Sequence, residues 1–287
     1  MAFRIPDSFR GRYRPLHTPA FGGLVDVDFY EAMDEACRED PLALLRLPDV
    51  ELIKDSRNEL LRASIPIGGA ARSIWIKRFR PVGPVSWSGY AFRQGKAQRA
   101  WNMAFELLGE GLETPRPLLG LRGTGFDGGA RGLLVTEDAG QTTALRQLLR
   151  QWTPGSAGRA RLVEDLASFV AQLHSRGFCH RDLSGGNILA RELGPGRLAF
   201  LLIDINRMRR FSALTTHRRL RDLERIRLDE GDIEVFFSAY SAGCEDAGAL
   251  RAVYRERADR YRRMRKTHSL VERLALKARY YWDDLWG

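Results

Sequence analysis

The 287-residue sequence contains few cysteines and no long apolar run. Its three cysteines, Cys37, Cys179 and Cys244, are odd in number and far apart, which speaks against a disulfide framework or a zinc cluster. No uninterrupted apolar stretch approaches the roughly 18 to 20 residues that a membrane-spanning helix needs. Residues 1–9 lack the apolar centre of a secretory signal. We therefore expect a protein of the reducing cytoplasm, either free or bound to a membrane surface.

Lysine is also scarce, and nearly all of the positive charge comes from arginine. Lys plus Arg number 46 against 36 Asp plus Glu, which gives a formal net charge of +10. Arginine is suited to binding phosphates and carboxylates, but the same bias can reflect genome composition. The charge alone therefore does not choose between nucleic acid, lipid phosphate and no polyanionic partner. With 44% apolar and 29% charged residues, the composition is that of a soluble globular chain of one large or two modest domains.

Hydrophobic periodicity predicts a β-rich part followed by a mostly helical part. A basic start and one or two short helices fill residues 1–48. Strands are then expected at 50–54, 60–67 and 72–79, a helix at 97–108, and a hairpin of 118–121 with 133–136. Further on, the pattern predicts a buried amphipathic helix over 162–173, a short hairpin of 188–190 with 198–203, and mostly helix from about residue 220.

The motif HRDLSGGN, from His180 to Asn187, carries the clearest chemical signal. In a kinase catalytic loop, an aspartate takes or orients the acceptor hydroxyl, and an asparagine five positions later holds a metal ion. Asp182 and Asn187 have this spacing, and Asp204 ends an apolar strand where a kinase places its main magnesium ligand. A triphosphate brings about four negative charges that magnesium must neutralise before a hydroxyl can approach. We therefore predict that these residues form a site for ATP and Mg²⁺.

Lys77 is the candidate for the lysine that contacts the α and β phosphates of ATP. Because side chains alternate along a strand, Trp75, Lys77 and Phe79 share one face. A lysine between aromatic residues on a strand is more often a surface residue than a ligand. However, Lys77 lies upstream of a helix, a hairpin and the 180–204 motifs, which is the order found in kinases. This order favours the phosphate-binding interpretation.

The segments HRDLSGGNIL at 180–189 and LIDINRMR at 202–209 resemble the Kdo/heptose family of lipopolysaccharide kinases, which have a protein-kinase-like fold. The resemblance covers roughly residues 50–240 and includes the segments KDSR at 54–57, IKRF at 76–79, TPRP at 114–117 and LVTE at 134–137. It implies a bilobal α+β fold, with a small antiparallel β N-lobe carrying one helix and a mostly helical C-lobe. It also implies ATP-dependent phosphorylation of a sugar hydroxyl in the lipopolysaccharide inner core, at the cytoplasmic face of the inner membrane.

On this basis we expect an N-terminal extension at 1–48, an N-lobe at 49–136, a hinge at 137–141 and a C-lobe at 142–287. Glu137 and Asp138 follow an apolar strand, where the hinge backbone would bind adenine. Ser56 and Arg57 fall between the first two strands, where a phosphate lid belongs. An ordinary polar turn explains Ser56 and Arg57 equally well.

The sequence departs from the protein-kinase pattern at three places. Asp204 is followed by Ile-Asn instead of Phe-Gly, which fits the resembled family. Ser184 stands where many protein kinases carry a lysine, so one phosphate-binding cation is missing, and Arg207 or another basic group is a candidate replacement. Glu106 is the acid available in the helix 97–108 to pair with Lys77. It lies later than the expected position, and a solvated helix residue is the alternative interpretation.

Arginines concentrate at 207–228 and 251–266. For 207–228, which follows Asp204, the charge favours contact with an anionic sugar acceptor, such as the lipopolysaccharide core, or with anionic inner-membrane lipids. For 251–266, a solvated helix face is the favoured interpretation. Nucleic acid is not expected, because the charge is not accompanied by a DNA- or RNA-binding motif. No Ala-Pro-Glu follows Asp204, which favours a compact or lipid-linked acceptor over a protein.

Two rival interpretations stay open. One is a small-molecule kinase of the aminoglycoside or choline type, which would use the same residues. The other is a catalytically silent kinase-like scaffold, suggested by the lid without glycine, by Ser184 and by the uncertain partner of Lys77.

Overall fold

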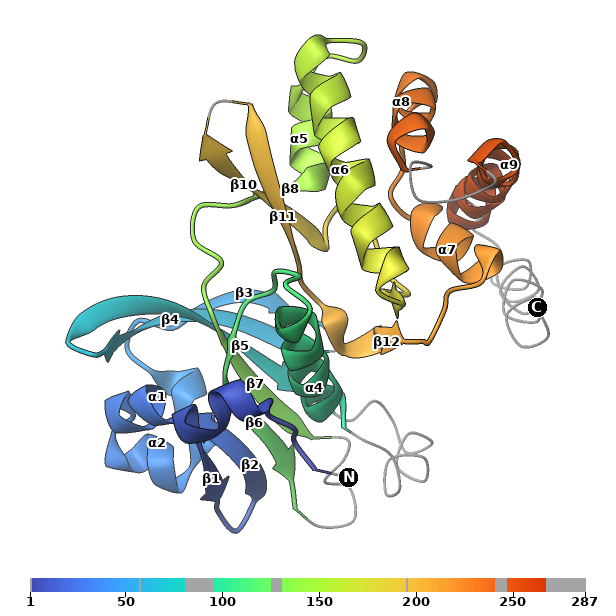
Figure 1. The fold of residues 1–287 in the computed structure, drawn as a ribbon. Coiled ribbons are helices and arrows are strands. Elements are labelled where there is room, and N and C mark those ends of the chain that lie inside the picture. The colour runs from blue at the N-terminus through green and yellow to red at the C-terminus, as the bar shows by residue number, and fades with distance from the viewer. Residues whose placement is uncertain are drawn as a thin grey trace. The chain divides into compact units, whose positions relative to one another are not determined.

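The computed structural model describes residues 2–56, 58–80, 95–124, 131–194, 196–240 and 247–266, with the side chains of the last helix described at 250–259. The chain forms two compact units (Figure 1). Unit 1 comprises Met1–Gln141 and Leu202–Arg207, and unit 2 comprises Thr142–Leu201 and Met208–Gly287. No helix of the described residues is both long enough and apolar enough to cross a membrane.

Unit 1 is built on a seven-stranded antiparallel sheet (Figure 1). In spatial order its strands are β1 (Tyr13–His17), β2 (Phe21–Asp26), β6 (Pro117–Gly123), β7 (Gly132–Glu137), β5 (Ala70–Phe79), β4 (Asn58–Ile67) and β3 (Glu51–Asp55). The turn between β4 and β5 has φ angles of 61° at Gly68 and 80° at Gly69. Glycine adopts this left-handed conformation without steric cost, so the Gly-Gly pair makes the tight hairpin that the sequence predicts.

Helices cover both faces of this sheet. On one face, Ile74 and Ile76 of β5 are fully buried in a core with Phe29, Met33 and Leu44. These three residues belong to the N-terminal segment that holds the 3₁₀ helix η1 (Asp7–Arg12), α1 (Val27–Ala32), α2 (Glu35–Glu39) and the 3₁₀ helix η2 (Pro41–Arg46). Because side chains alternate along a strand, burial of Ile74 and Ile76 leaves Lys77 on the opposite face.

The opposite face is covered by α4 (Lys96–Gly109), which packs on β6 and β7. Trp101 of α4 lies directly over Gly120 of β6, while the flanking Leu119 and Leu121 belong to the core on the other face. Helix α4 also packs on the short 3₁₀ helix η4 (Ile205–Arg207), to which Arg99 Nε donates a 3.2 Å hydrogen bond at the carbonyl of Asn206. The segment after Asp204 is therefore anchored within unit 1.

The strands β1 and β2 are an addition that the sequence analysis does not predict. Helices within residues 28–47 are confirmed as α1, α2 and η2, but residues 13–26 join the same sheet as β3 to β5. Pro15 in β1 and Gly22-Gly23 in β2 lower the strand signal of this segment. Proline is tolerated because β1 lies at the edge of the sheet.

Unit 2 is mostly helical. Its helices are α5 (Leu145–Gln151), α6 (Ala157–Ser175), α7 (Thr216–Leu223), α8 (Glu230–Tyr240) and α9 (Ala247–Lys266). Two small sheets accompany them, one ordered β11 (Arg197–Leu202), β10 (Ile188–Gly194), β8 (Thr143–Ala144), the other pairing β12 (Arg209–Arg210) with β9 (Phe178–Cys179). Leu162, Leu166, Val170 and Leu173 form the fully buried stripe that the sequence predicts on α6. The predicted hairpin at 188–203 is present as β10 and β11.

Candidate active site

Within unit 1, Lys77 meets Asp204. Lys77 Nζ donates a 2.7 Å hydrogen bond to Asp204 Oδ1, although 127 residues separate the two in the sequence. The Lys77 amine also lies 5.5 Å from the ring centre of Phe79, the aromatic neighbour on its own strand face. The Lys77 side chain is 21% exposed and that of Asp204 is 42% exposed. Two of the four residues selected by spacing are thus in direct contact, and both are accessible to a ligand.

The backbone around Asp204 explains how its carboxylate is presented. Strand β11 ends at Leu202, whose carbonyl accepts a 2.8 Å hydrogen bond from Thr114 Oγ1. Asp204 then adopts a φ of 57°, which costs a non-glycine residue roughly 1 kcal/mol or more. Asn206 follows in η4, where its side-chain Nδ2 donates a 2.6 Å hydrogen bond to Asp204 Oδ1. Such strained positions cluster at functional sites.

Within unit 2, Asp182 and Asn187 are brought together by a tight loop. The carbonyl of Asp182 accepts hydrogen bonds from Asn187 Nδ2 at 2.9 Å and from the Ser184 amide at 2.8 Å. The backbone N–H of Asn187 in turn donates a 2.8 Å hydrogen bond to the Ser184 carbonyl. Among the described residues, no donor engages the side-chain oxygen of Asn187, so that oxygen can serve as a metal ligand. The second pair of predicted residues is therefore also in contact.

Asp222 at the end of α7 holds this loop, and the sequence analysis does not select it. Its fully buried carboxylate accepts hydrogen bonds from the backbone amides of His180 and Arg181. Burial is the largest single influence on its pKa and would raise it, but the hydrogen bonds and charges of His174 and His180 together lower the pKa. Asp222 is therefore an ionised anchor. The one sequence signal for Asp222 is that it is an acidic residue within the arginine-rich segment 207–228.

Arg225 reaches the side chain of Asp182. Its Nη1 donates a 2.8 Å hydrogen bond to Asp182 Oδ1, and the Arg225 side chain is 12% exposed. The sequence analysis names Arg207, or another basic group, as a replacement for the cation missing at Ser184. Within unit 2, a basic group that contacts the loop of Asp182 directly is Arg225.

The hinge residues differ in detail from the prediction. The amides of Glu137 and Asp138 donate to the carbonyls of Arg116 and Ser73 at 3.0 and 3.2 Å, so neither amide is available to adenine. The side chains are also engaged, because Glu137 accepts a hydrogen bond from Arg116 and Asp138 Oδ2 accepts a 3.2 Å bond from Trp75 Nε1. Among the described residues, the amide of Ala139 has no acceptor. Of these three consecutive residues, Ala139 is therefore the one whose backbone amide is open to a ligand.

Two further predicted contributions are not supported by contacts. Ser56 lies in the turn between β3 and β4, where its amide donates a 3.3 Å hydrogen bond to the Asn58 carbonyl. Arg57 lies outside the described residues. Glu106 is partly exposed on α4, and within the described part of the chain the carboxylate that pairs with Lys77 belongs to Asp204. The Lys77–Glu106 pair, which the sequence leaves open, is not formed among the described residues, where Asp204 contacts Lys77.

The arginines of segment 207–228 divide into two groups. Some are engaged internally: Arg219 Nη1 donates to Tyr240 Oη at 3.3 Å, and the Arg218 guanidinium lies 4.1 Å from the ring centre of Phe211. Others, including Arg209 and Arg227, are exposed, and their side chains form no hydrogen bond or ion pair with a described residue. This second group is available to an anionic ligand.

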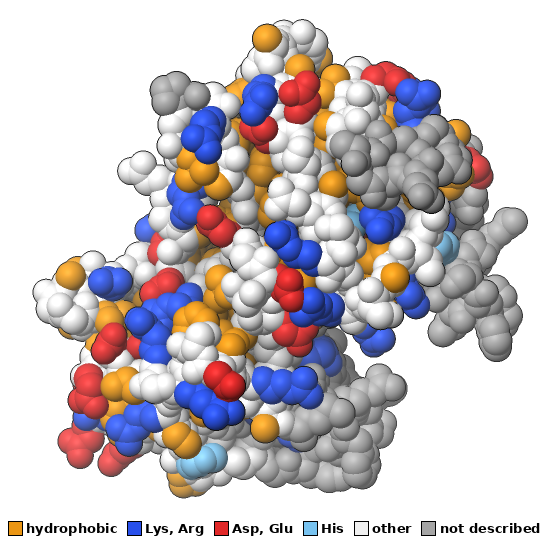
Figure 2. All heavy atoms as spheres, in the orientation of Figure 1, with side chains coloured by type: hydrophobic (Ala, Val, Ile, Leu, Met, Phe, Trp, Pro, Cys, Tyr) orange, Lys and Arg blue, Asp and Glu red, His pale blue; other side chains and the backbone are white. Residues whose placement is uncertain are grey.

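In segment 251–266, the arginines whose side chains the structure describes are paired. Arg255 Nε lies 3.1 Å from Glu230 Oε2 on α8, Arg251 pairs with Glu234, and Arg257 Nε donates a 3.1 Å hydrogen bond to the buried Glu224. On the face drawn in Figure 2, Lys and Arg side chains are interspersed with Asp and Glu over much of the surface. For the described part of this helix, these contacts fit the solvated face that the sequence favours.

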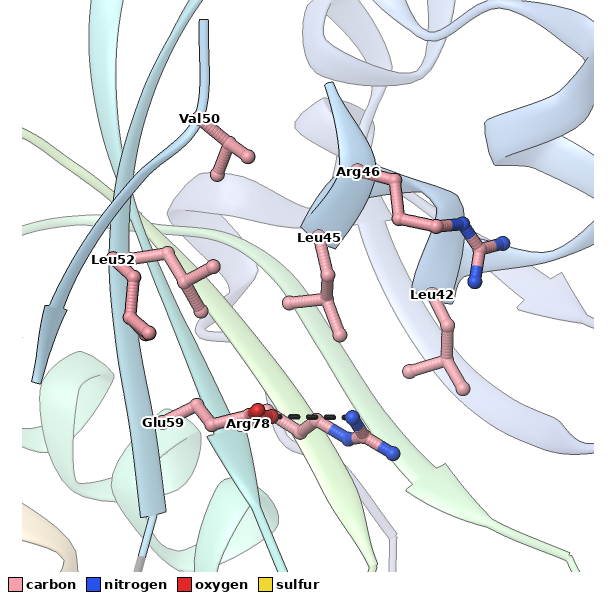
Figure 3. A pocket seen from close by; sticks show the side chains of 8 residues that line it. Leu42, Leu45, Arg46, Val50, Leu52, Glu59 and Arg78 are labelled. Atoms are coloured by element: carbon pink, nitrogen blue, oxygen red, sulfur yellow. Dashed lines mark hydrogen bonds and ion pairs between the residues drawn. The ribbon is translucent and has the colours of Figure 1, made fainter. Parts of the chain in front are cut away.

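A hollow of about 380 Å³ opens in unit 1 beside η2 (Figure 3). An ion pair borders it, with Arg78 Nη1 3.1 Å from Glu59 Oε2. Its lining residues are Leu42, Leu45, Arg46, Val50, Leu52, Glu59, Leu61 and Arg78. None of them is among the residues selected for chemistry, so this hollow is distinct from the predicted site.

Comparisons with known proteins agree with this geometry. The model of the lipopolysaccharide kinase (Kdo/WaaP) family matches residues 75–240, more than half of the chain and a range that contains Lys77, Asp182, Asn187 and Asp204. No curated protein matches. A solved structure described as WaaP in complex with acyl carrier protein is similar, with a TM-score of 0.54 and 20% identity over 77% of this chain and 92% of that one. This likeness confirms the kinase-like α+β fold, and the family match confirms an ATP-using phosphotransferase. The chain belongs to the lipopolysaccharide kinase (Kdo/WaaP) family.

Proposed function

We propose that this protein uses ATP to phosphorylate a sugar hydroxyl of the lipopolysaccharide inner core, on Kdo or heptose. The observation that carries the proposal is the 2.7 Å contact between Lys77 Nζ and Asp204 Oδ1. A phosphate-binding cation and a metal-binding carboxylate must lie together in any kinase of this kind, because both act on the same phosphates. A silent scaffold has no such requirement.

Each of the central residues has a distinct role in this proposal. Lys77 binds the α and β phosphates, and the Ala139 amide binds the adenine ring. Asp182 orients the acceptor hydroxyl for in-line attack on the terminal phosphorus. Asp182 suits this task because its side chain is 33% exposed, while its backbone carbonyl is fixed by Ser184 and Asn187.

The side chains fit a magnesium ion. Magnesium in phosphoryl-transfer sites takes one or two carboxylates, and the substrate phosphates and water supply the other ligands. Asp204 offers a carboxylate and Asn187 an amide oxygen, which are ligands of the type that magnesium prefers. The described residues hold no group of three or more His, Cys, Asp or Glu that would suit a zinc site. When bound, Mg²⁺ would neutralise charge on the transferred phosphoryl group.

An anionic acceptor is supported by the surface charge. The chain carries a formal net charge of +10, and Arg209 and Arg227 are exposed without an acidic partner among the described residues. An acidic core sugar or a lipid phosphate would be attracted to such arginines. On this basis the acceptor is an anionic, lipid-linked sugar presented at a membrane surface.

The test is to incubate the full chain with ATP, magnesium and defined lipopolysaccharide core fragments and to weigh the products. We expect one added phosphate on a Kdo or heptose fragment. Asp182→Ala should retain nucleotide binding and lose at least about 10²-fold in transfer rate. Asp7→Ala, which removes an exposed aspartate 83% accessible to solvent, should behave like the parent.

Other outcomes would redirect or end the proposal. Transfer to an aminoglycoside or choline in place of the core sugars would show a small-molecule kinase. Absence of magnesium-dependent ATP turnover would show a silent scaffold. Unchanged turnover by Asp182→Ala would refute its assigned role. Because the similar structure is described as a complex with acyl carrier protein, the assay is run with and without that protein.

A further inference from the structure

Arg225 makes a contact that the family-level function does not explain. Its guanidinium Nη1 lies 2.8 Å from Asp182 Oδ1, across 43 residues of sequence. The Arg225 side chain is 12% exposed and that of Asp182 is 33% exposed. A hydrogen bond between opposite charges that are largely shielded from water is stronger and better oriented than an ion pair on an open surface.

Residues at and just after the end of α7 bind both the backbone and a side chain of the catalytic loop. Asp222 binds the backbone amides of His180 and Arg181, and Arg225, three residues later, binds the carboxylate of Asp182. The Arg225 amide also donates a 3.3 Å hydrogen bond to the Asp222 carbonyl, which ties the two groups into one turn. Arg181 has a φ of 64°, a strained conformation that persists when surrounding contacts determine it.

The contact leaves one carboxylate oxygen for the substrate. Asp182 Oδ1 is taken by Arg225, and among the described residues no donor binds Oδ2. The carboxylate of an aspartate can rotate about the Cβ–Cγ bond, and this terminal torsion angle has only a broad preference. Fixing Oδ1 therefore fixes the direction in which Oδ2 faces the acceptor hydroxyl.

The same contact brings positive charge to the catalytic loop. Ser184 stands where many protein kinases have a lysine, two residues after the catalytic aspartate. Arginine provides a planar, permanently charged group with several donors, which a serine hydroxyl does not provide. A guanidinium beside Asp182 can stabilise the negative charge of the phosphoryl group as it moves to the acceptor.

We propose that Arg225 is a positioning residue for phosphoryl transfer, which fixes the Asp182 carboxylate and supplies from the end of α7 the cation that the loop lacks at Ser184. This inference rests on the proposed kinase function. It adds a residue outside the motif HRDLSGGN to the machinery, and it predicts a dependence between Arg225 and Ser184.

The test compares Arg225→Met, Arg225→Lys and the double variant Arg225→Met with Ser184→Lys in the full chain. Arg225→Met should lower kcat about 10²-fold, as expected for a misplaced catalytic group, with the KM for ATP changed less than about twofold. Arg225→Lys should keep a larger part of kcat, and Ser184→Lys should restore at least about tenfold in the Arg225→Met background. The control is Arg161→Met, since Arg161 forms a 3.1 Å ion pair with Asp165 on α6 and is 60% exposed.

Each variant is assayed for transfer to core fragments and, without acceptor, for hydrolysis of ATP, and its Tm is recorded. A parent rate in Arg225→Met would overturn the proposal. A second result would also overturn it: Arg225→Met loses activity and its Tm falls, and adding Ser184→Lys restores neither the activity nor the Tm. A purely structural ion pair would give this result. If the parent hydrolyses ATP but transfers nothing to core sugars, the proposed acceptor fails, and hydrolysis then decides the role of Arg225. If the parent does neither, both proposals fail.

Discussion

At the scale of residues, the four polar positions selected by spacing occur as two contacting pairs. Lys77 meets Asp204 in unit 1, and Asp182 meets Asn187 in unit 2. Motif spacing could predict these residues because the pattern records which side chains the chemistry needs. Their joint action on one nucleotide stays a prediction.

Three further residues could not be predicted from local pattern. Asp222 and Arg225 act on a loop about forty positions earlier in the chain, and nothing near them in sequence marks this contact. Ala139 has no functional side chain, and it is identified by the engagement of the neighbouring amides. The sequence could not decide whether Glu106 pairs with Lys77 for a related reason, because order along a helix does not determine which carboxylate a strand lysine meets.

For Lys77, we predict that Lys77→Met lowers kcat/KM for ATP by about 10²- to 10³-fold, as loss of a charged donor to the phosphates should. Folding should be little changed, since Asp204 is 42% exposed and can be solvated by water. Steady-state kinetics and thermal melting check this. The matched control is Arg72→Met, which removes an exposed cation from the same strand. Comparable losses in both variants would contradict a specific phosphate contact.

At the scale of elements, strong hydrophobic periodicity is sufficient to locate helices and strands in the sequence, and weak periodicity is not. The hairpin of β4 and β5, helix α4 and helix α6 all lie where alternation or helical spacing predicts them. Strands β1 and β2 were missed because proline and glycine interrupt them, and pairing with β6 compensates for the poor local signal. Tertiary pairing of this kind is invisible to a local window.

The connection between α6 and the catalytic loop gives an element-scale prediction. Gly177 has a φ of 80°, its carbonyl accepts a 2.9 Å hydrogen bond from the Phe211 amide, and a Cβ there would collide with the Phe211 carbonyl. Gly177→Ala should therefore destabilise unit 2 by about 2–4 kcal/mol, through backbone strain and overpacking. Urea unfolding measures this.

Gly155→Ala is the matched control for this prediction. Gly155 has a nearly equal φ of 79° but no atom within 4 Å of the added Cβ. It should cost about 1 kcal/mol, because strain alone is introduced. An equal loss of stability in the two variants would show that the Phe211 backbone moves away from the added Cβ at no cost in free energy.

At the scale of the whole molecule, the excess of arginine has two different uses that composition could not separate. Arg159 is 3% exposed and binds Asp232 with Nε–Oδ1 and Nη2–Oδ2 distances of 2.9 and 2.6 Å, which joins α6 to α8. Arg209, by contrast, is exposed. The net charge therefore does not show how many arginines are available to an anionic ligand, because some of them are buried and paired with acidic residues.

Stability should also depend on pH through Glu224. Burial raises the pKa of Glu224 from 4.5 to about 7, against the opposing influence of Arg257 and two further arginines. Between these values the folded protein holds a proton that the unfolded chain has lost, so stability falls as pH rises from about 4.5 to about 7. The expected change is on the order of 3 kcal/mol. Glu224→Gln should flatten it, as urea midpoints at pH 5 and pH 7.5 would show.

A control variant separates this effect from general acid titration. The pKa of Glu234 is lowered by its hydrogen bond with Arg255, so its contribution is lost only on acidification below its ordinary value of 4.5. Glu234→Gln should therefore leave the change between pH 4.5 and 7 in place. If Glu224→Gln retains the parent's slope in that window, another group is responsible for it.

The composition of unit 1 has a consequence for biosynthesis. Its main body is finished at Gln141, but the segment Leu202–Arg207 is translated only after a further sixty residues that belong to unit 2. A nascent chain that has emerged as far as Gln141 can pair the strands of its sheet but has no Asp204 for Lys77. Domains generally fold as units during synthesis, the N-terminal one first. During synthesis, unit 1 therefore stays incomplete until the segment Leu202–Arg207 has also emerged from the ribosome.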